Sequence, residues 1–364
     1  MGQINEEQYI RKVFSEYYQS CDFPIVSIER REFGIGNIKK IDSRHLSFKT
    51  INEFRNFLKI NTPLFVSHST SYYEFPSATP MERKIQKGAD LVFDLDIHAD
   101  GKFGAYHKLP QVKEDLIRLV NDFIIGDFGV KRSDLLIVFS GNRGYHVHVR
   151  DPKFLTLGSE ERRELVDYVM GNGLNYKDFF TLSDTKPPKL FGPMPNEGGY
   201  RGRFARETIK NVKENPNLIS RTLKGEKGDF FISGINEGNW SRISLDLNDL
   251  VSRLSKVSAN LIIGSVDTDA GVTQDLSKLI RVPNSIHGDT GLIARAISDI
   301  EKFEPFKDAQ IQRKNKIKIE FIEDVPNNPQ IIGATGPFKR GEKLEIDESL
   351  GIFFIIKGCA LRAE

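Results

Sequence analysis

Leu91-Val92-Phe93-Asp94-Leu95-Asp96-Ile97 is an apolar run interrupted by two carboxylates. The run predicts a buried strand, in which side chains at positions i and i+2 point to the same face. Asp94 and Asp96 are therefore expected side by side, where like charges repel unless a cation neutralises them. Ligation by oxygen alone favours Mg²⁺ or Mn²⁺ over zinc. For an isolated D-x-D the commoner interpretation is a strand end with two solvated carboxylates. The other motifs must therefore decide between a metal site and a solvated strand end.

The order of predicted elements indicates the fold class. Apolar spacing predicts helices at residues 5–19, 113–125 and 159–170, and strands at 26–33, 45–48, 63–68, 135–139, 145–149, 261–263, 317–322 and 352–356. Several of these strands are joined as hairpins, so we expect an α+β fold with a mixed or largely antiparallel sheet and flanking helices. Residues 1–150 and 259–364 are predicted to form one catalytic domain, and 151–258 an inserted, smaller, mostly helical or irregular lobe.

Composition excludes several classes of protein. The 364 residues are 39% hydrophobic and 28% charged with a formal charge of +2, so a polyanion could bind only where basic residues gather locally. Cys21 and Cys359 are the only cysteines, which excludes a disulfide framework or a cysteine zinc site and fits a reducing cytosol. No apolar run reaches the roughly 18 residues of a membrane span. We expect a soluble, cytoplasmic protein without a membrane partner.

A second group of polar residues follows the strand at 135–139. Ser140-Gly141-Asn142-Arg143-Gly144 predicts a tight turn, and His146 and His148 then alternate on a returning strand. The N–H groups of such a turn, with Ser140 and Arg143, could cradle a phosphate. The alternative is a structural histidine pair on a solvated hairpin.

A third group combines a carboxylate, a cation and an imidazole: Asp275, Arg281 and His287. Taken alone, Asp275 could equally be a helix cap or a turn residue. A nucleotide substrate would give all three groups a role in one site. Carboxylates that hold two metal ions can stabilise the attacking and leaving oxygens of a phosphoryl transfer, while Ser, Arg and His side chains bind the other phosphate oxygens. The sequence contains neither a Walker-type loop nor G-x-G-x-x-G, which disfavours P-loop hydrolysis and dinucleotide binding.

The three motifs in this order, D-x-D, S-G-x-R-G-x-H and D-x(5)-R-x-P-x-S-x-H-G, resemble the catalytic small subunit of archaeal and eukaryotic replicative DNA primase, the archaeal form most. Arg31-Glu32-Phe33 and the ending Ser349-Leu350-Gly351-Ile352 are similar as well. The resemblance runs from about residue 8 to the C-terminus and is weakest over 171–258. It implies template-directed primer synthesis by two-metal nucleotidyl transfer from nucleoside triphosphates.

The resemblance also implies roles for single residues. Two Mg²⁺ or Mn²⁺ ions would be held by Asp94, Asp96 and Asp275. Phosphates of the incoming nucleotide would be contacted by Ser140, Arg143, His146, Arg281 and His287, and also by Arg31. His148 is not carried over and is interpreted as structural.

One departure concerns zinc. Relatives commonly hold a structural zinc through Cys and His residues after the D-x-D strand, whereas residues 97–108 here contain His98 and His107 and no cysteine. Two histidines do not make a structural zinc site, so no zinc is predicted.

The implied partners are a large regulatory subunit, a single-stranded DNA template with its primer, and nucleoside triphosphates. Basic residues of the insertion (Arg201, Arg203, Arg206, Lys210 and Lys213) could contact the template strand or simply form a solvated helix face.

Three other functions compete with this hypothesis. A related primase-polymerase of DNA repair or end joining shares the three motifs. A catalytically silent nucleic-acid-binding subunit could keep the fold, although the retained Asp, Ser, Arg and His residues argue against it. A metal-dependent phosphatase or nuclease fits the carboxylates but not the S-G-x-R-G-x-H turn.

Overall fold

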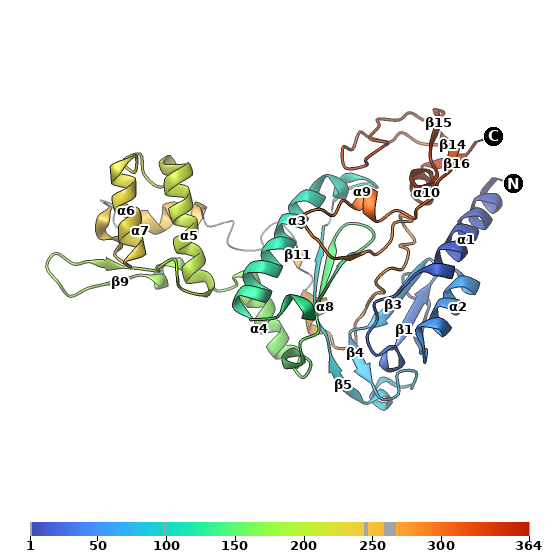
Figure 1. Cartoon of the computed structure of the whole chain (residues 1–364), viewed down its shortest axis with the longest axis horizontal. Coiled ribbons are helices and arrows are strands. Elements are labelled where there is room, and N and C mark those ends of the chain that lie inside the picture. Colours follow the sequence, from blue (N-terminus) through green and yellow to red (C-terminus); the bar gives the residue numbers. More distant parts are fainter. Residues whose placement is uncertain (1, 98, 244–246, 258–266, 269, 364) are drawn as a thin grey trace. The chain divides into compact units, whose positions relative to one another are not determined.

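The computed structural model describes residues 2–97, 99–243, 247–257, 267–268 and 270–363. The chain divides into two compact units. One contains Met1–Ile117, Lys131–Arg163 and Val266–Glu364, and the other contains Arg118–Val130 and Glu164–Ser265. Figure 1 labels many of the elements of each unit.

A five-stranded sheet in the first unit carries the D-x-D strand, β6 (Leu91–Asp96). Its strand order is β11-β6-β8-β7-β13, and every pairing in it is antiparallel. The other four strands are β7 (Leu135–Phe139), β8 (Tyr145–Val149), β11 (Asp267–Thr268) and β13 (Ala296–Ile297). In the pairing of β6 with β8, Asp94 lies directly opposite His146. This register brings the first two predicted motifs together.

A second sheet has the order β12-β3-β1-β2 and is also antiparallel. Its strands are β1 (Phe33–Gly36), β2 (Ser43–Leu46), β3 (Phe65–Ser69) and β12 (Leu279–Arg281). The helices α1 (Gly2–Ser20) and α2 (Ile51–Asn61) pack against each other beside β1 and β3 (Figure 1). Phe33 of β1, Phe54 of α2 and Phe48 form a buried aromatic cluster.

The remaining elements of the first unit complete its core. They are the hairpin β4 (Ser71–Tyr73) and β5 (Gln86–Ala89), the helices α3 (Leu109–Arg118), α8 (Ala270–Gln274) and α9 (Pro305–Asp308), and a sheet of β14 (Lys316–Phe321), β15 (Lys343–Asp347) and β16 (Ala360–Arg362) covered by α10 (Glu348–Ile356). The predicted α+β class with antiparallel sheets is therefore confirmed.

The second unit is mainly helical. It contains most of α4 (Ser159–Met170), the helices α5 (Gly199–Glu214), α6 (Glu226–Asn236) and α7 (Leu247–Val257), a π-helical stretch at Leu119–Asp127, and a short hairpin of β9 (Thr181–Leu182) and β10 (Leu190–Phe191). Trp240 is fully buried against Phe180, Phe204 and Phe231. None of the helices in the described ranges is long and apolar enough to cross a membrane.

Two of the predicted strands are wrong. Of residues 26–33 only Phe33 belongs to a strand, because Ser27 adopts a left-handed conformation and Ile28–Arg30 form a 3₁₀ turn. Residues 352–356 lie in α10, whose residues from Glu348 to Ile355 are all buried. A short run that is apolar on every side shows no period, so the sequence does not separate a buried helix from a strand there. The strand predicted at 261–263 lies outside the described residues.

Two buried histidines predict a loss of stability in mild acid. His68 and His148 stack with ring centroids 6.1 Å apart, and burial holds the pKa of each well below its usual value. Below pH 6.5 the unfolded chain takes up protons that the folded chain does not bind. The free energy of unfolding should therefore fall by up to about 1.4 kcal/mol per pH unit for each histidine as the pH drops from 6.5 to 5. Urea unfolding at pH 7.5 and 5.5 measures this fall. A His68→Leu/His148→Leu variant should show a clearly smaller fall, and an unchanged one would refute this assignment.

Candidate active site

One polar pocket of about 400 Å³ collects most of the predicted site residues. The predicted residues that line it are Asp94, Asp96, Ser140, Arg143, His146, Arg281 and His287. They come from β6, from the turn between β7 and β8, from β8, from β12 and from the loop after β12. The five-stranded and the four-stranded sheet thus contribute to one pocket, although Asp94 and His287 are 193 residues apart in the sequence.

The two carboxylates lie beside different nitrogen groups. The Nε2 of His146 is 3.4 Å from Oδ1 of Asp94, and Nη2 of Arg143 donates to Oδ2 of Asp96 at 2.9 Å. Burial, together with the nearby charge of Arg281, lowers the pKa of His146 to about 3. His146 is therefore a neutral imidazole at pH 7, and Arg143 supplies the positive charge next to the acidic pair.

The turn at residues 140–144 has the compact shape that its glycines predict. The Oγ of Ser140 accepts hydrogen bonds from the N–H groups of Asn142 at 3.3 Å and Gly144 at 3.1 Å. A side chain at Gly144 would place its Cβ 1.9 Å from the carbonyl oxygen of Leu95, so only glycine lets the turn approach β6 this closely. The turn thereby holds Arg143 against the end of the D-x-D strand.

His287 presents a hydrogen-bond donor. Its Nδ1 accepts the N–H of Asp289 at 3.1 Å, and burial keeps its pKa well below the usual value. A neutral imidazole that accepts at Nδ1 carries its proton on Nε2. The hydroxyl of Thr290 donates to the carbonyl of Gly141 at 2.6 Å, which ties the His287 loop to the turn at 140–144.

Arg281 supplies a second cation to the pocket. It lies on β12 directly opposite Ser67 of β3, with its guanidinium carbon 5.5 Å from the centre of the Phe65 ring. Burial lowers its pKa to about 10, so it remains charged at pH 7. Its Nη1 is buried and has no hydrogen-bond partner in the described part of the chain. A buried donor of this kind is costly unless a ligand satisfies it, and a phosphate oxygen would do so.

Two predicted site residues do not line this pocket. Asp275 is exposed, and its Oδ1 accepts hydrogen bonds from the N–H and the hydroxyl of Ser277 at 2.8 and 2.7 Å. Arg31 is fully buried and pairs with Asp90 at 2.7 Å. His148 is also outside the pocket lining.

The pocket contains residues that sequence reasoning missed. Lys40, Ser67, Asn142 and Lys278 bring further cations, a hydroxyl and an amide. Asn142 stood within the S-G-x-R-G-x-H motif. Ser67 reaches the pocket because β3 pairs with β12, and Lys40 reaches it from the loop between β1 and β2, and spacing along the chain reveals neither position. In the described ranges no group of three His, Cys, Asp or Glu residues could hold a metal ion. His98 lies outside those ranges, so the absence of zinc stays a prediction.

The backbone also places an acidic segment beside β6. Strand β11 pairs antiparallel with β6, with Asp267 opposite Asp96 and Thr268 opposite Leu95. The signal for this segment was in the sequence, as Asp267-Thr268-Asp269. Its pairing partner could not be read from the sequence.

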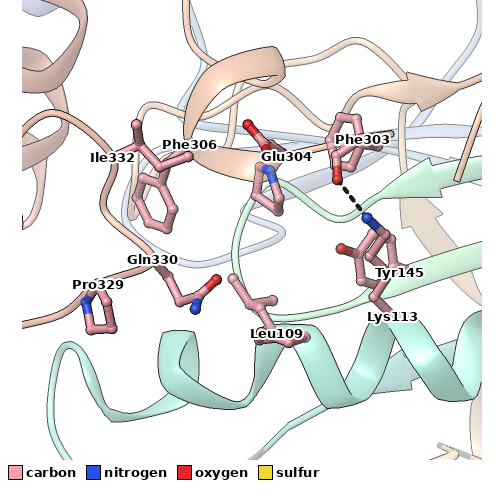
Figure 2. A pocket seen from close by; sticks show the side chains of 11 residues that line it. Leu109, Lys113, Tyr145, Phe303, Glu304, Phe306, Pro329, Gln330 and Ile332 are labelled. Atoms are coloured by element: carbon pink, nitrogen blue, oxygen red, sulfur yellow. Dashed lines mark hydrogen bonds between the residues drawn. The ribbon is translucent and has the colours of Figure 1, made fainter. Parts of the chain in front are cut away.

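A smaller hollow of about 180 Å³ has a different character (Figure 2). It is lined mainly by apolar side chains, among them Leu109, Phe303, Phe306 and Ile332. The Lys113 ammonium in this hollow donates its hydrogen bonds to backbone carbonyls, including that of Phe303 at 3.1 Å (Figure 2). Such a hollow does not suit a phosphate, so the larger pocket is the candidate active site.

The larger pocket thus brings an acidic pair together with arginine and histidine side chains on an antiparallel α+β core. The family described as DNA primase small subunit matches residues 93–299. DNA primase small subunit PriS of Methanococcoides burtonii is 30% identical over 98% of this chain and 98% of its own length. The proteins of the same name from Methanothrix thermoacetophila (32% identical, 97% of this chain and 98% of that protein) and Archaeoglobus fulgidus (30%, 97% and 97%) are similar along the same span. The chain belongs to the DNA primase small subunit family.

Proposed function

We propose that this chain synthesises short primers on single-stranded DNA by joining nucleoside triphosphates, as the catalytic subunit of a replicative primase. The observation that carries the proposal is the gathering of Asp94, Asp96, Ser140, Arg143, His146, Arg281 and His287 around one pocket. The family and the near full-length similarity to proteins named DNA primase small subunit support it.

The acidic pair fits a divalent cation by its chemistry. Asp94 and Asp96 offer hard oxygen donors from one face of a strand, which is the ligation that Mg²⁺ or Mn²⁺ prefers. Two such ions, when bound, would polarise the phosphate and stabilise the attacking and leaving oxygens. The protein's own groups would bind the triphosphate: Arg143 and Arg281 by charge, and the Nε2–H of His287 as a neutral donor.

For the third carboxylate, the geometry favours the β11 segment over Asp275. Asp275 is exposed and already bonded to Ser277, whereas β11 runs alongside β6. We expect Asp275→Asn to retain primer synthesis within about threefold, and Asp267→Asn to lower it at least tenfold, about 1.4 kcal/mol in the barrier. Primer yield at saturating Mg²⁺ compares the two variants. An inactive Asp275→Asn enzyme together with an active Asp267→Asn enzyme would restore Asp275 as the third ligand.

Arg143 tests the phosphate role of the turn. Because its side chain is about 30% exposed and its ion pair among the described residues is with Asp96, Arg143→Ala should cost little stability, within about 1 kcal/mol. It should weaken nucleoside triphosphate binding by about tenfold to a hundredfold, the range expected from losing one charge-assisted contact of about 1.5–3 kcal/mol. Titration of a fluorescent nucleotide measures the change. Arg132→Ala, which removes an exposed arginine outside the pocket, is the control.

The experiment that tests the function is primer synthesis on single-stranded DNA with labelled nucleotides, with Mg²⁺ or Mn²⁺ and with chelator. We expect product with metal and none with chelator. No product under any of these conditions, alone or with the large subunit, would overturn the proposal and leave a silent nucleic-acid-binding subunit as the better reading.

The partners follow from this function. We propose a heterodimer with a large regulatory subunit, acting on chromosomal DNA in the cytoplasm. A repair primase-polymerase would work with different partner proteins. If the chain is the replicative subunit, its purification from the native cell should recover the large primase subunit. Recovery of repair factors in its place would favour the repair enzyme.

A further inference from the structure

The loop between β1 and β2, Asn37–Asp42, is held in one shape by its own last residue. The carboxylate of Asp42 accepts hydrogen bonds from the backbone N–H groups of Asn37, Ile38 and Lys39 at 2.6, 2.8 and 3.0 Å. A Cβ at Gly36 would lie 1.9 Å from the carbonyl oxygen of Lys39, so the chain closes on itself there. What this β1–β2 loop presents to solvent is therefore fixed by its backbone.

The loop presents an unusual side chain. Ile38 is 91% exposed, more than any other large exposed hydrophobic residue in the described part of the chain. Lys39 and Lys40 follow it and are also exposed, and neither ammonium forms a salt bridge within the described ranges. An apolar side chain held rigidly in water beside two cations gains free energy only when a partner covers it.

The loop borders the active site. Lys40 and Ile41 line the same pocket as Asp94 and Arg143, and the charge of Lys40 contributes to lowering the pKa of His287. Ile38 and Lys39 do not line the pocket. They therefore mark the surface immediately outside the nucleotide site, where the nucleic acid that continues from that site would lie.

We propose that the β1–β2 loop binds the single-stranded template next to the nucleotide site, with Lys39 and Lys40 contacting phosphates and Ile38 covering the face of an unstacked base. This proposal rests on the proposed primase function. Cations track a nucleic-acid backbone, and apolar side chains, isoleucine among them, contact or wedge between base faces. The exposed face of a base is available in a single strand and not in an intact duplex, which selects the template over the finished primer duplex.

The test compares an Ile38→Ser/Lys39→Ser variant with the parent. Both residues are outside the pocket lining, so the affinity for free nucleoside triphosphate should stay within about twofold. We expect the affinity for a fluorescent oligo-dT, measured by anisotropy, to fall about tenfold at low salt, the combined loss of one apolar contact with a base and one phosphate contact. The slope of log K against log salt should shrink by about 0.7, the value for one cation on a single strand.

The chain offers a matched control. Lys59 and Ile60 on α2 are also an exposed lysine and isoleucine, with Ile60 78% exposed, and neither lines the pocket. Lys59→Ser/Ile60→Ser should bind oligo-dT as the parent does. Ile38→Phe, which enlarges the apolar face and keeps both cations, should bind at least as tightly as the parent.

Three outcomes would overturn the proposal: equal loss in the loop variant and the control, no loss in the loop variant, or an equal loss of affinity for duplex and single strand. These three outcomes are measured as binding affinities, and they bear on the loop when the parent protein makes primers. If the primase function itself were wrong, the parent protein would make no primers, so the two failures are distinguishable.

Discussion

Primer synthesis should fall by at least about a hundredfold when Asp94 and Asp96 are both replaced by asparagine. The amides keep the size of the side chains and remove the charge that would hold the metal ions. Loss of several kcal/mol of transition-state stabilisation corresponds to a rate loss of this size or more. Primer yield from labelled nucleotides measures the loss, and calorimetric titration with Mn²⁺ should show that metal binding is lost with it.

The same variant should fold normally. Two like charges on one strand face oppose folding, and the Arg143–Asp96 pair that is lost is only about 70% buried, so the free energy of unfolding should change by less than about 1.5 kcal/mol. Asp299→Asn/Asp324→Asn removes two carboxylates that lie outside the pocket lining and serves as the control. Full activity in the Asp94/Asp96 variant would contradict the metal assignment, and unfolding of the variant would show a structural role instead.

How much of this site the sequence predicts depends on where each residue lies along the chain. Asp94 and Asp96 are predictable because strand alternation alone puts them on one face. Ser140, Arg143 and His146 are predictable because a glycine turn joins two adjacent strands, so local geometry places them. Arg281 and His287 were recognised by motif order, and the structure shows why they belong: β12 pairs with β3, and the His287 loop is tied to the turn by Thr290.

Other residues near the site depend on long-range pairing. Asp275 was assigned through the resemblance to the family, and it lies outside the pocket lining, whereas the strand that pairs with β6 is β11, several residues earlier. Lys40 reaches the pocket from a loop that no motif marked. Similarly, the run at 352–356 became a helix because α10 is buried on all sides, where periodicity carries no information.

Arg31 is a case in which a family motif residue has a structural explanation. The resemblance implies a nucleotide contact, but the Arg31 side chain is fully buried. Its Nη2 donates to Asp90 at 2.7 Å, and its Nη1 donates to the carbonyls of Ser69 and Thr70 at 2.9 and 2.8 Å. Its guanidinium also lies 3.8 Å from the centre of the Tyr72 ring, and the Tyr72 hydroxyl donates to the other oxygen of Asp90. This network joins the segment before β1, the β3–β4 connection and the residue that precedes β6.

Replacing Arg31 with methionine should therefore destabilise the fold by about 3–5 kcal/mol, because Asp90 is left as a buried charge without its cation. Urea unfolding measures the change. Arg31→Met/Asp90→Asn should recover part of the loss, since the charge that remained buried is then removed as well. At low temperature, where the variant is still folded, nucleotide affinity should match that of the parent.

The opposite pattern would return Arg31 to the nucleotide site. A variant with parental stability and a tenfold weaker nucleotide affinity would mean that the guanidinium leaves Asp90 when substrate binds. Arg44→Met provides the comparison, since Arg44 also pairs with a buried carboxylate, Glu32, and Glu32 keeps the buried Lys84 3.5 Å away as a second cation. Because Glu32 is not left alone, Arg44→Met should cost less stability than Arg31→Met. The difference in the free energy of unfolding between the two variants separates two effects: leaving a buried carboxylate without a cation, and losing an arginine side chain.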